Sequence, residues 1–230
     1  MIVNQNKNIV DNSKNSFYTV KEPDYNIEGV FITMREAAKQ LADETMKKNK
    51  DGSAKITTKD IVGVGMFAAV LAVLSQISIP MPSGVPITLQ TFAVALAGVV
   101  LAWKLGTASV LVYILLGAVG VPVFAGFTGG AQALVNYTGG FIWGFIAMAL
   151  LCGIGVRMNN KIAGMLLGIA GLAVCHFFGT IQFMIVMKMG FVESFLLASA
   201  PYLIKDVISV VLGFVIGGQI RTRLLKAGLL

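Results

Sequence analysis

The sequence predicts an all-α integral membrane protein, a bundle of about six transmembrane helices. Hydrophobic residues make up 56% of the 230 residues, whereas charged residues make up only 13%. About a quarter of the residues of a typical soluble domain are charged. A chain of this size has too small a core to bury so large an apolar surplus, so we expect a lipid bilayer to be its solvent.

Two long stretches of the chain, 61–103 and 105–156, contain no charged side chain. One membrane-spanning helix needs roughly 20 apolar residues, so each stretch is long enough for two spans. Pro and Gly residues interrupt each stretch near its middle, where a pair of antiparallel helices would reverse direction. The predicted spans are 60–79, 88–103, 105–119, 139–156, 162–187 and 201–220.

The basic residues beside the spans predict how the protein is oriented. Cytoplasmic connections of membrane proteins carry an excess of Lys and Arg. If the first span starts on the cytoplasmic side, only Lys188 falls on an outer connection. Both termini are therefore predicted to be cytoplasmic, and the net charge of +7 is a topology signal that does not indicate nucleic-acid binding. The basic residues on the predicted inner side are Lys55, Lys59, Lys104, Arg157, Lys161, Arg221, Arg223 and Lys226.

The chain divides into a cytoplasmic N-terminal extension, 1–58, and a six-helix transmembrane domain, 59–230. No apolar stretch of signal-peptide length precedes Ile61. Within the extension, Thr33 and Glu36 fit a capping box and predict a short amphipathic helix. That helix either lies on the inner membrane surface or is fully solvated.

The outer connection 120–138 is rich in apolar and aromatic residues and carries no charge. Irregular backbone at membrane depth is tolerated where it is buried in protein or lines a cavity. We therefore expect this segment to form a lid or wall over a pocket that opens outward.

Polar side chains near the outer ends of two spans are candidates for a binding site. Lys205 and Asp206 lie within the last span, and an ionisable residue there costs roughly 2.5–3.5 kcal/mol. Lys205 can extend its ammonium group to the interface, but Asp206 is shorter and lies deeper, which favours a functional role. Gln90, with Thr88 nearby, either contacts a ligand or forms a hydrogen bond between helices.

Sequence signatures of enzymes and metal sites are absent. The chain has no His-Glu-x-x-His motif and no phosphate-binding loop, so we predict neither catalysis nor ATP hydrolysis by this chain. The single histidine, His176, and the cysteines Cys152 and Cys175 have no ligand spacing. We interpret His176 as a packed or helix-bonded residue and the cysteines as small buried residues. No metal and no resident cofactor are therefore expected.

Several ordered motifs resemble the BioY family, the biotin-specific substrate-binding (S) components of energy-coupling-factor (ECF) transporters. They are GVPITLQTF at 84–92, LLGAVGVPVFAG at 115–126, TGGF at 138–141 and PYLIKD at 201–206. The resemblance runs over roughly 57–218 and implies a six-helix component of a bacterial plasma membrane. It implies capture of biotin from outside and inward delivery with a membrane coupling subunit and two ATPase subunits, which hydrolyse ATP.

This resemblance suggests how the candidate residues would share one ligand. Biotin has ureido N–H groups, a ureido oxygen, an apolar ring and a carboxylate, and each buried polar group needs a partner. We expect Asp206 to accept from a ureido N–H, and Lys205 to meet the carboxylate near the outer mouth. The remaining predicted binding residues are Gln90, Thr88 and Asn136 at polar atoms, and Tyr113, Phe124, Phe127 and Tyr137 around the ring.

The resemblance also suggests a partner-docking surface. Ala68 and Ala72 lie one turn apart on the first span, and small residues let helices approach closely. Similar pairs in family members face the coupling subunit; the alternative is packing inside the bundle.

The chain departs from the family pattern at Asn136-Tyr137, where Gly-Pro is usual, and at Ser209, where Lys is usual. The alternative functions are an S component for another vitamin, or a small channel or structural membrane protein.

Overall fold

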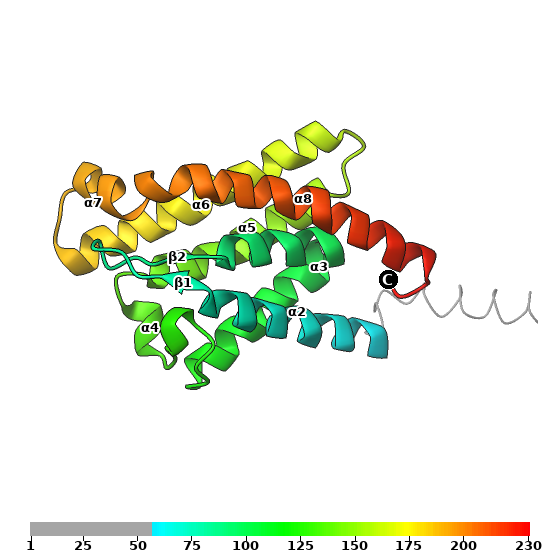
Figure 1. Ribbon diagram of the computed structural model, residues 1–230, viewed down its shortest axis with the longest axis horizontal. Coiled ribbons are helices and arrows are strands. Elements are labelled where there is room, and N and C mark those ends of the chain that lie inside the picture. Colours follow the sequence, from blue (N-terminus) through cyan, green and yellow to red (C-terminus); the bar gives the residue numbers. More distant parts are fainter. Residues whose placement is uncertain (1–56) are drawn as a thin grey trace, which may run out of the picture. The chain divides into compact units, whose positions relative to one another are not determined.

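The computed structural model describes residues 57–230, so the predicted N-terminal extension lies outside the described residues except at its end. Four segments in this part are long and apolar enough to cross a membrane: Thr58–Gln76, Gln90–Ala118, Lys161–Met187 and Phe191–Lys226. The elements are α2 (Thr58–Gln76), β1 (Ser78–Ile79), β2 (Ile87–Thr88), α3 (Gln90–Ala118), the 3-10 helix η2 (Ala125–Phe127), α4 (Gln132–Val135), α5 (Gly139–Gly155), α6 (Lys161–Met187), α7 (Phe191–Ala198), η3 (Ala200–Tyr202) and α8 (Leu203–Lys226) (Figure 1).

Helix α3 folds back on itself at Ala102, whose φ of 61° lies in the left-handed region. The Gln90 Nε2 atom donates to the Tyr113 hydroxyl at 2.8 Å, although the two residues are 23 positions apart. In one straight helix they would be separated by about 34 Å, at 1.5 Å per residue. The two arms, 90–101 and 103–118, are therefore antiparallel, as the two predicted spans required. With these arms counted separately, residues 57–230 contain six long helices, as predicted.

Two helix starts follow directly from local sequence. Thr57 and Asp60 form a capping box at the start of α2, in which each side chain accepts from the other's backbone N–H. Asn160 caps α6 by accepting from the N–H of Ile162 at 2.9 Å. At its other end, α6 stops at Lys188, which adopts the left-handed conformation.

One end of the bundle, which we call the closed end, brings together the α3 reversal, the α5–α6 connection and the C-terminal part of α8. A Cβ on Gly153 would lie 2.4 Å from the Trp103 backbone nitrogen. Between α5 and α6, a Cβ on Gly155 would lie 2.3 Å from the Gly164 carbonyl oxygen. Such close backbone approach is a common way for helices to associate in lipid. The Arg221 guanidinium of α8 donates to the Val100 carbonyl at 2.6 Å, beside the reversal.

The opposite end, which we call the cavity end, carries the two-stranded β1–β2 hairpin, α4 and α7 (Figure 1). The two strands are antiparallel, with Ser78 opposite Thr88 and Ile79 opposite Ile87. Helix α7 was not predicted; it lies in the connection 188–200 between the last two predicted spans. The last predicted span, 201–220, is observed as α8.

The predicted docking pair does not lie on an exposed surface. Ala68 is only 2% exposed and belongs to the hydrophobic core, and Ala72 is half-buried against that core. The Ala68 side chain therefore faces the bundle interior, so the alternative of internal packing holds for this residue. The exposed residues of α2 are Thr58, Lys59, Ile61, Val62, Gly65, Met66, Ala69 and Val73.

Candidate functional site

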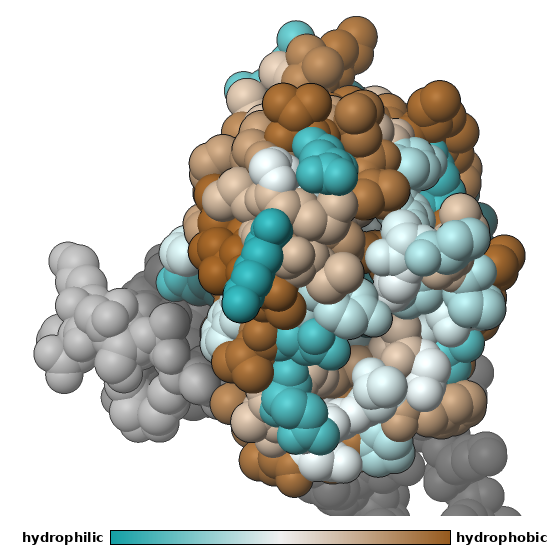
Figure 2. All heavy atoms as spheres, turned by 90° about the vertical axis from the view of Figure 1, so that its left-hand side faces the viewer, coloured by the Kyte–Doolittle hydropathy of each residue, from teal (hydrophilic) through white to brown (hydrophobic). Residues whose placement is uncertain are grey.

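A cavity of about 440 Å³ lies at the cavity end, within the usual 300–1,000 Å³ range of small-molecule pockets. Its walls come from the β1–β2 hairpin, the segment 120–138 and helices α3, α5, α6 and α8. Seen from this end, hydrophilic residues interrupt a largely hydrophobic surface (Figure 2). The lining includes polar side chains at Thr88, Gln90, Thr91, Thr128, Gln132, Asn136, Thr138, His176, Lys205 and Asp206, and aromatic ones at Phe124, Tyr137, Phe141, Phe145 and Tyr202.

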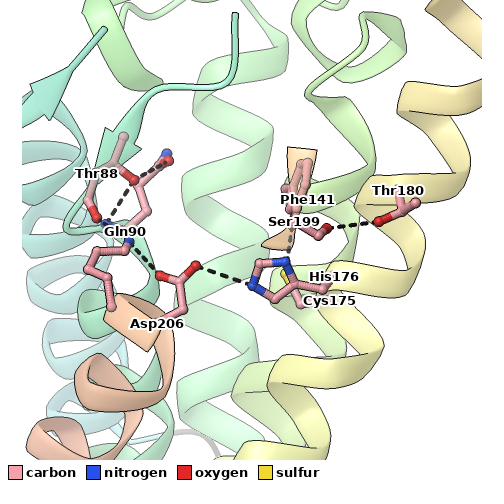
Figure 3. A network of polar contacts seen from close by, with 9 residues as sticks. Thr88, Gln90, Phe141, Cys175, His176, Thr180, Ser199 and Asp206 are labelled. Atoms are coloured by element: carbon pink, nitrogen blue, oxygen red, sulfur yellow. Dashed lines mark hydrogen bonds and ion pairs between the residues drawn. The ribbon is translucent and has the colours of Figure 1, made fainter. Parts of the chain in front are cut away.

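Asp206 is the buried charge of this cavity, with 5% of its surface exposed. It lies in the first turn of α8 and is flanked by two nitrogen-bearing side chains. The Lys205 Nζ forms an ion pair with the Asp206 Oδ1, and the His176 Nε2 lies 3.2 Å from the Oδ2 (Figure 3). A buried carboxylate needs charged and hydrogen-bonded partners. The Asp206 Oδ2 has a hydrogen bond with His176, whereas the Oδ1 has the ion pair with Lys205 and no hydrogen-bond partner among residues 57–230.

Gln90 is held in one orientation by its neighbours. Its Oε1 accepts from the Thr88 hydroxyl at 3.1 Å, and its Nε2 donates to the buried Tyr113 hydroxyl at 2.8 Å. Lys205 also donates to the Thr88 carbonyl at 2.8 Å, which links this group to the Asp206 pair (Figure 3). Hydrogen bonds and one ion pair therefore link Gln90 and Thr88 through Lys205 to Asp206 and His176.

The segment 120–138 forms a cavity wall, as the sequence predicted, and side chains of two helices brace it. At the end of α2, the Gln76 Nε2 donates to the carbonyls of Val123 (3.1 Å) and Phe124 (3.2 Å). The Gln76 Oε1 accepts from the Phe127 N–H at 2.9 Å. From α6, the Gln182 Nε2 donates to the carbonyls of Leu134 (2.9 Å) and Asn136 (2.6 Å). These bonds satisfy backbone groups that no helix or sheet satisfies.

The β1–β2 hairpin loop is fixed to the opposite wall by two tyrosines. The Tyr202 hydroxyl donates to the Val85 carbonyl at 2.5 Å and shares a hydrogen bond with Ser83 at 2.7 Å. The Tyr137 hydroxyl donates to the Gly84 carbonyl at 3.3 Å. Gly84 has a φ of +82°, and a Cβ there would lie 3.2 Å from the Tyr137 ring. Both the backbone conformation and the lack of space therefore favour glycine at this position.

Most predicted binding residues line the cavity, but two do not. Tyr113 is completely buried behind Gln90 and packs edge-on against Phe124 at 5.4 Å. Phe127 is 72% exposed and is not part of the cavity lining. The predicted residues found in the lining are Thr88, Gln90, Phe124, Asn136, Tyr137, Lys205 and Asp206.

Several lining residues were not predicted to bind the ligand, among them His176. The sequence favoured a packed or helix-bonded histidine, and the structure shows it in contact with Asp206 of α8. Its sequence signal was present: it is the single histidine, set in an apolar span. Phe141 and Tyr202 were quoted as parts of motifs but were not assigned to the cavity. In residues 57–230, no group of three or more His, Cys, Asp or Glu side chains could hold a metal ion.

The fold and the site together define a multi-pass membrane protein with one ligand-sized, polar-walled cavity at one end of a six-helix bundle. Residues 46–226 match the sequence model of the BioY family. The chain belongs to the BioY family.

Relatives of known name agree with this assignment. The chain is 44% identical over 122 residues to "Biotin transporter BioY" of Thermotoga maritima, covering 53% of this chain and 72% of that one. It is 36% identical over 163 residues to "Probable biotin transporter BioY" of Pyrococcus horikoshii, covering 71% and 96%. The fold is similar to the crystal structure of "the S-component for biotin from an ECF-type ABC transporter", with a TM-score of 0.67 and 24% identity. That match covers 73% of this chain and 95% of the other.

Proposed function

We propose that this chain is the biotin-binding S component of an ECF-type uptake transporter in a bacterial plasma membrane. It captures biotin from outside and delivers it inward with an ATP-driven partner module; the chain itself is not an enzyme. Family membership and the named relatives support the substrate. The observation that carries the proposal is the buried Asp206 carboxylate in the wall of a ligand-sized cavity.

The cavity chemistry fits a cyclic urea with an apolar ring. Asp206 accepts from a ureido N–H of biotin, a bond to a charged group that contributes about 1.5–3 kcal/mol. Lys205 balances the Asp206 charge, so the polar wall meets the neutral ring of biotin without an excess charge. Phe124 and Tyr137, both in the lining, enclose the ring, and Tyr113 acts behind them by orienting Gln90.

The biotin carboxylate requires a partner of its own. Lys205 has three N–H donors, of which Asp206 and the Thr88 carbonyl occupy two. Its side chain is 31% exposed, so the third donor is available to the carboxylate from the cavity. Asn136, exposed at the cavity mouth, supplies an amide for the same end of the ligand.

A binding measurement on the purified, detergent-solubilised protein tests the substrate. We expect saturable, one-to-one binding of biotin, and no competition by riboflavin or thiamine. Binding of riboflavin or thiamine in place of biotin would identify a component for another vitamin. No saturable binding of any of these would favour a channel or structural protein and would refute the proposal.

We further propose that both termini are cytoplasmic and that the cavity opens outward. The native cysteines are buried, which gives a low labelling background. Pro82→Cys lies in the exposed hairpin loop at the cavity end, and Asn159→Cys is exposed at the closed end. In intact cells, an impermeant thiol reagent added outside should label the cysteine at 82 and not the one at 159. The reverse pattern would invert the topology.

The partner module that we propose consists of a membrane coupling subunit and two ATPase subunits. Because Ala68 is buried, the docking surface proposed for the coupling subunit moves to the exposed face of α2. Gly65 and Ala69 lie there one turn apart, and a Cβ on Gly65 would meet nothing within 4 Å. Such a flat, small-residue surface allows another helix to approach closely in lipid.

A further inference from the structure

We infer that His176 is a positioning residue for the ligand: it holds the Asp206 carboxylate in the orientation that accepts from the ligand's N–H. This inference rests on the proposed function, since it concerns the same cavity. His176 belongs to α6 and Asp206 to α8, so the contact also joins two helices at the depth of the cavity.

The two carboxylate oxygens of Asp206 have different partners. Lys205 pairs with the Oδ1, and the His176 Nε2 lies 3.2 Å from the Oδ2. A lysine side chain has four rotatable bonds and follows a carboxylate that turns. His176 is 5% exposed, and its ring packs against Phe141, so it defines a fixed direction. With the Oδ2 bound to that ring, the remaining acceptor positions of the carboxylate are fixed as well.

The hydrogen-bonding groups around the ring indicate its tautomer. An ionised carboxylate is only an acceptor, so the Nε2 carries the proton that it donates to Asp206. The Nδ1 is buried and has no hydrogen-bond partner among the described residues. A proton on the Nδ1 would be a buried donor without an acceptor, which is unfavourable. The geometry therefore assigns a neutral His176 with its proton on the Nε2, leaving Lys205 as the counter-charge of Asp206.

Helix α5 holds the imidazole ring from its other side. The Phe141 ring packs edge-to-face on His176, with centroids 5.7 Å apart and planes at 86° (Figure 3). Phe141 is itself confined, because a Cβ on Gly179 would lie 2.3 Å from its Cε1. The Cys175 thiol donates to the Phe141 carbonyl at 3.4 Å. A chain of contacts from Gly179 through Phe141 and His176 therefore reaches the Asp206 carboxylate.

Because the chain contains one histidine, nitrogen NMR of the imidazole reads this contact without any ligand. The protein is purified without a histidine tag and labelled with ¹⁵N-histidine. We expect the ring proton on the Nε2, and a clear shift of the Nε2 signal in Asp206→Asn. A proton on the Nδ1 alone, or imidazole signals unchanged by Asp206→Asn, would overturn the inference.

Biotin affinity tests the functional consequence. His176→Phe keeps an aromatic ring but removes the donor, and should weaken biotin binding about tenfold or more. His176→Gln can still donate from its amide and should stay within about threefold of the wild type. Phe177→Leu, a change at an exposed position beside it, is the control and should leave affinity unchanged.

A double variant separates positioning from a direct or merely structural role. If His176 acts through Asp206, then in the Asp206→Asn background His176→Phe should change affinity by less than about threefold. An equal loss in both backgrounds, or wild-type affinity in His176→Phe, would refute positioning. A wild-type protein that does not bind biotin would refute the proposed function, while the NMR measurement would still decide the His176–Asp206 contact.

Discussion

The two ends of the bundle solve opposite packing problems. At the closed end, glycines bring backbones together: Gly153 packs on the α3 reversal and Gly155 on Gly164. At the cavity end, Gly140 also brings α5 close to the Phe178 backbone of α6, but polar side chains support the rest of the wall: Gln76 and Gln182 brace the segment 120–138 from two different helices. The same six helices are therefore joined tightly at one end and enclose a cavity at the other.

This difference indicates which properties each end should control. Packing without voids stabilises the whole bundle, so changes at the closed end should alter folding. The cavity end contains a linked group of polar side chains around a space, so changes there should alter ligand binding more than folding. The predictions below test that division.

The largest effect is expected at the closed end. Gly153→Ala would place a Cβ 2.4 Å from the Trp103 nitrogen and 2.7 Å from the Ala102 carbonyl carbon, which are backbone atoms that cannot rotate away. We expect a loss of about 3 kcal/mol in stability, seen as a lower Tm and poorer yield. Gly218→Ala in α8 is the control: its Cβ meets nothing within 4 Å, so Tm should not fall. Equal Tm values for the two variants would contradict the close packing.

The next largest effect is expected at the cavity end, on biotin affinity and not on stability. Asp206→Asn should weaken biotin binding by about 1.5–3 kcal/mol, because the bond to a charged acceptor becomes a bond to a neutral one. Its Tm without ligand should stay near that of the wild type, since the change removes a charge from the membrane interior. Isothermal titration and thermal unfolding of the same sample check both statements. Unchanged affinity in a well-folded variant would remove Asp206 from the site.

Much of the fold could be predicted because membrane spans depend on local composition. The charge-free stretches 61–103 and 105–156 led to two pairs of helices, and the reversal lies at Ala102, close to the predicted boundary. Helix α7 was missed because its eight residues are too few for a membrane span and lie in the connection 188–200. Which face of α2 is buried could not be predicted either, since Ala68 and Ala69 belong to a helix that is apolar on all sides.

The candidate site was predictable in its composition but not in its pairs. Asp206 and Lys205 stood out because charge is costly in a span. His176, the hydrogen-bond partner of Asp206, lies 30 residues away in another helix, and no local sequence pattern connects the two residues. Tyr113 and Phe127 are aromatic and close to the predicted motif, but only tertiary packing turns one behind Gln90 and the other outward.

A smaller effect on both properties is expected where a helix braces the cavity wall. Gln76→Leu removes the donor to Val123 and Phe124 and the acceptor for the Phe127 N–H. We expect a loss of about 1 kcal/mol in biotin affinity, mostly through faster dissociation, because the loosened wall opens more often. Gln76→Glu keeps an acceptor for the Phe127 N–H, so its biotin affinity should lie between those of the wild type and Gln76→Leu. A Gln76→Leu variant with the wild-type dissociation rate would show that the wall holds without this brace.

The smallest effect on folding and binding is expected on the outer surface of α2, which belongs to neither end. Ala69 is exposed, so Ala69→Trp should change stability by less than about 0.5 kcal/mol and leave biotin affinity unchanged. Its neighbour Ala68 is 2% exposed in the core, so Ala68→Trp should overpack the bundle and lower Tm. The pair thus compares one residue type and one substitution on two faces of a single helix.

Because close approach of helices in lipid needs small side chains, Ala69→Trp should also weaken co-purification with the coupling subunit. Normal co-purification of Ala69→Trp would move the docking surface to another helix, and a loss of biotin binding in that variant would place Ala69 inside the bundle.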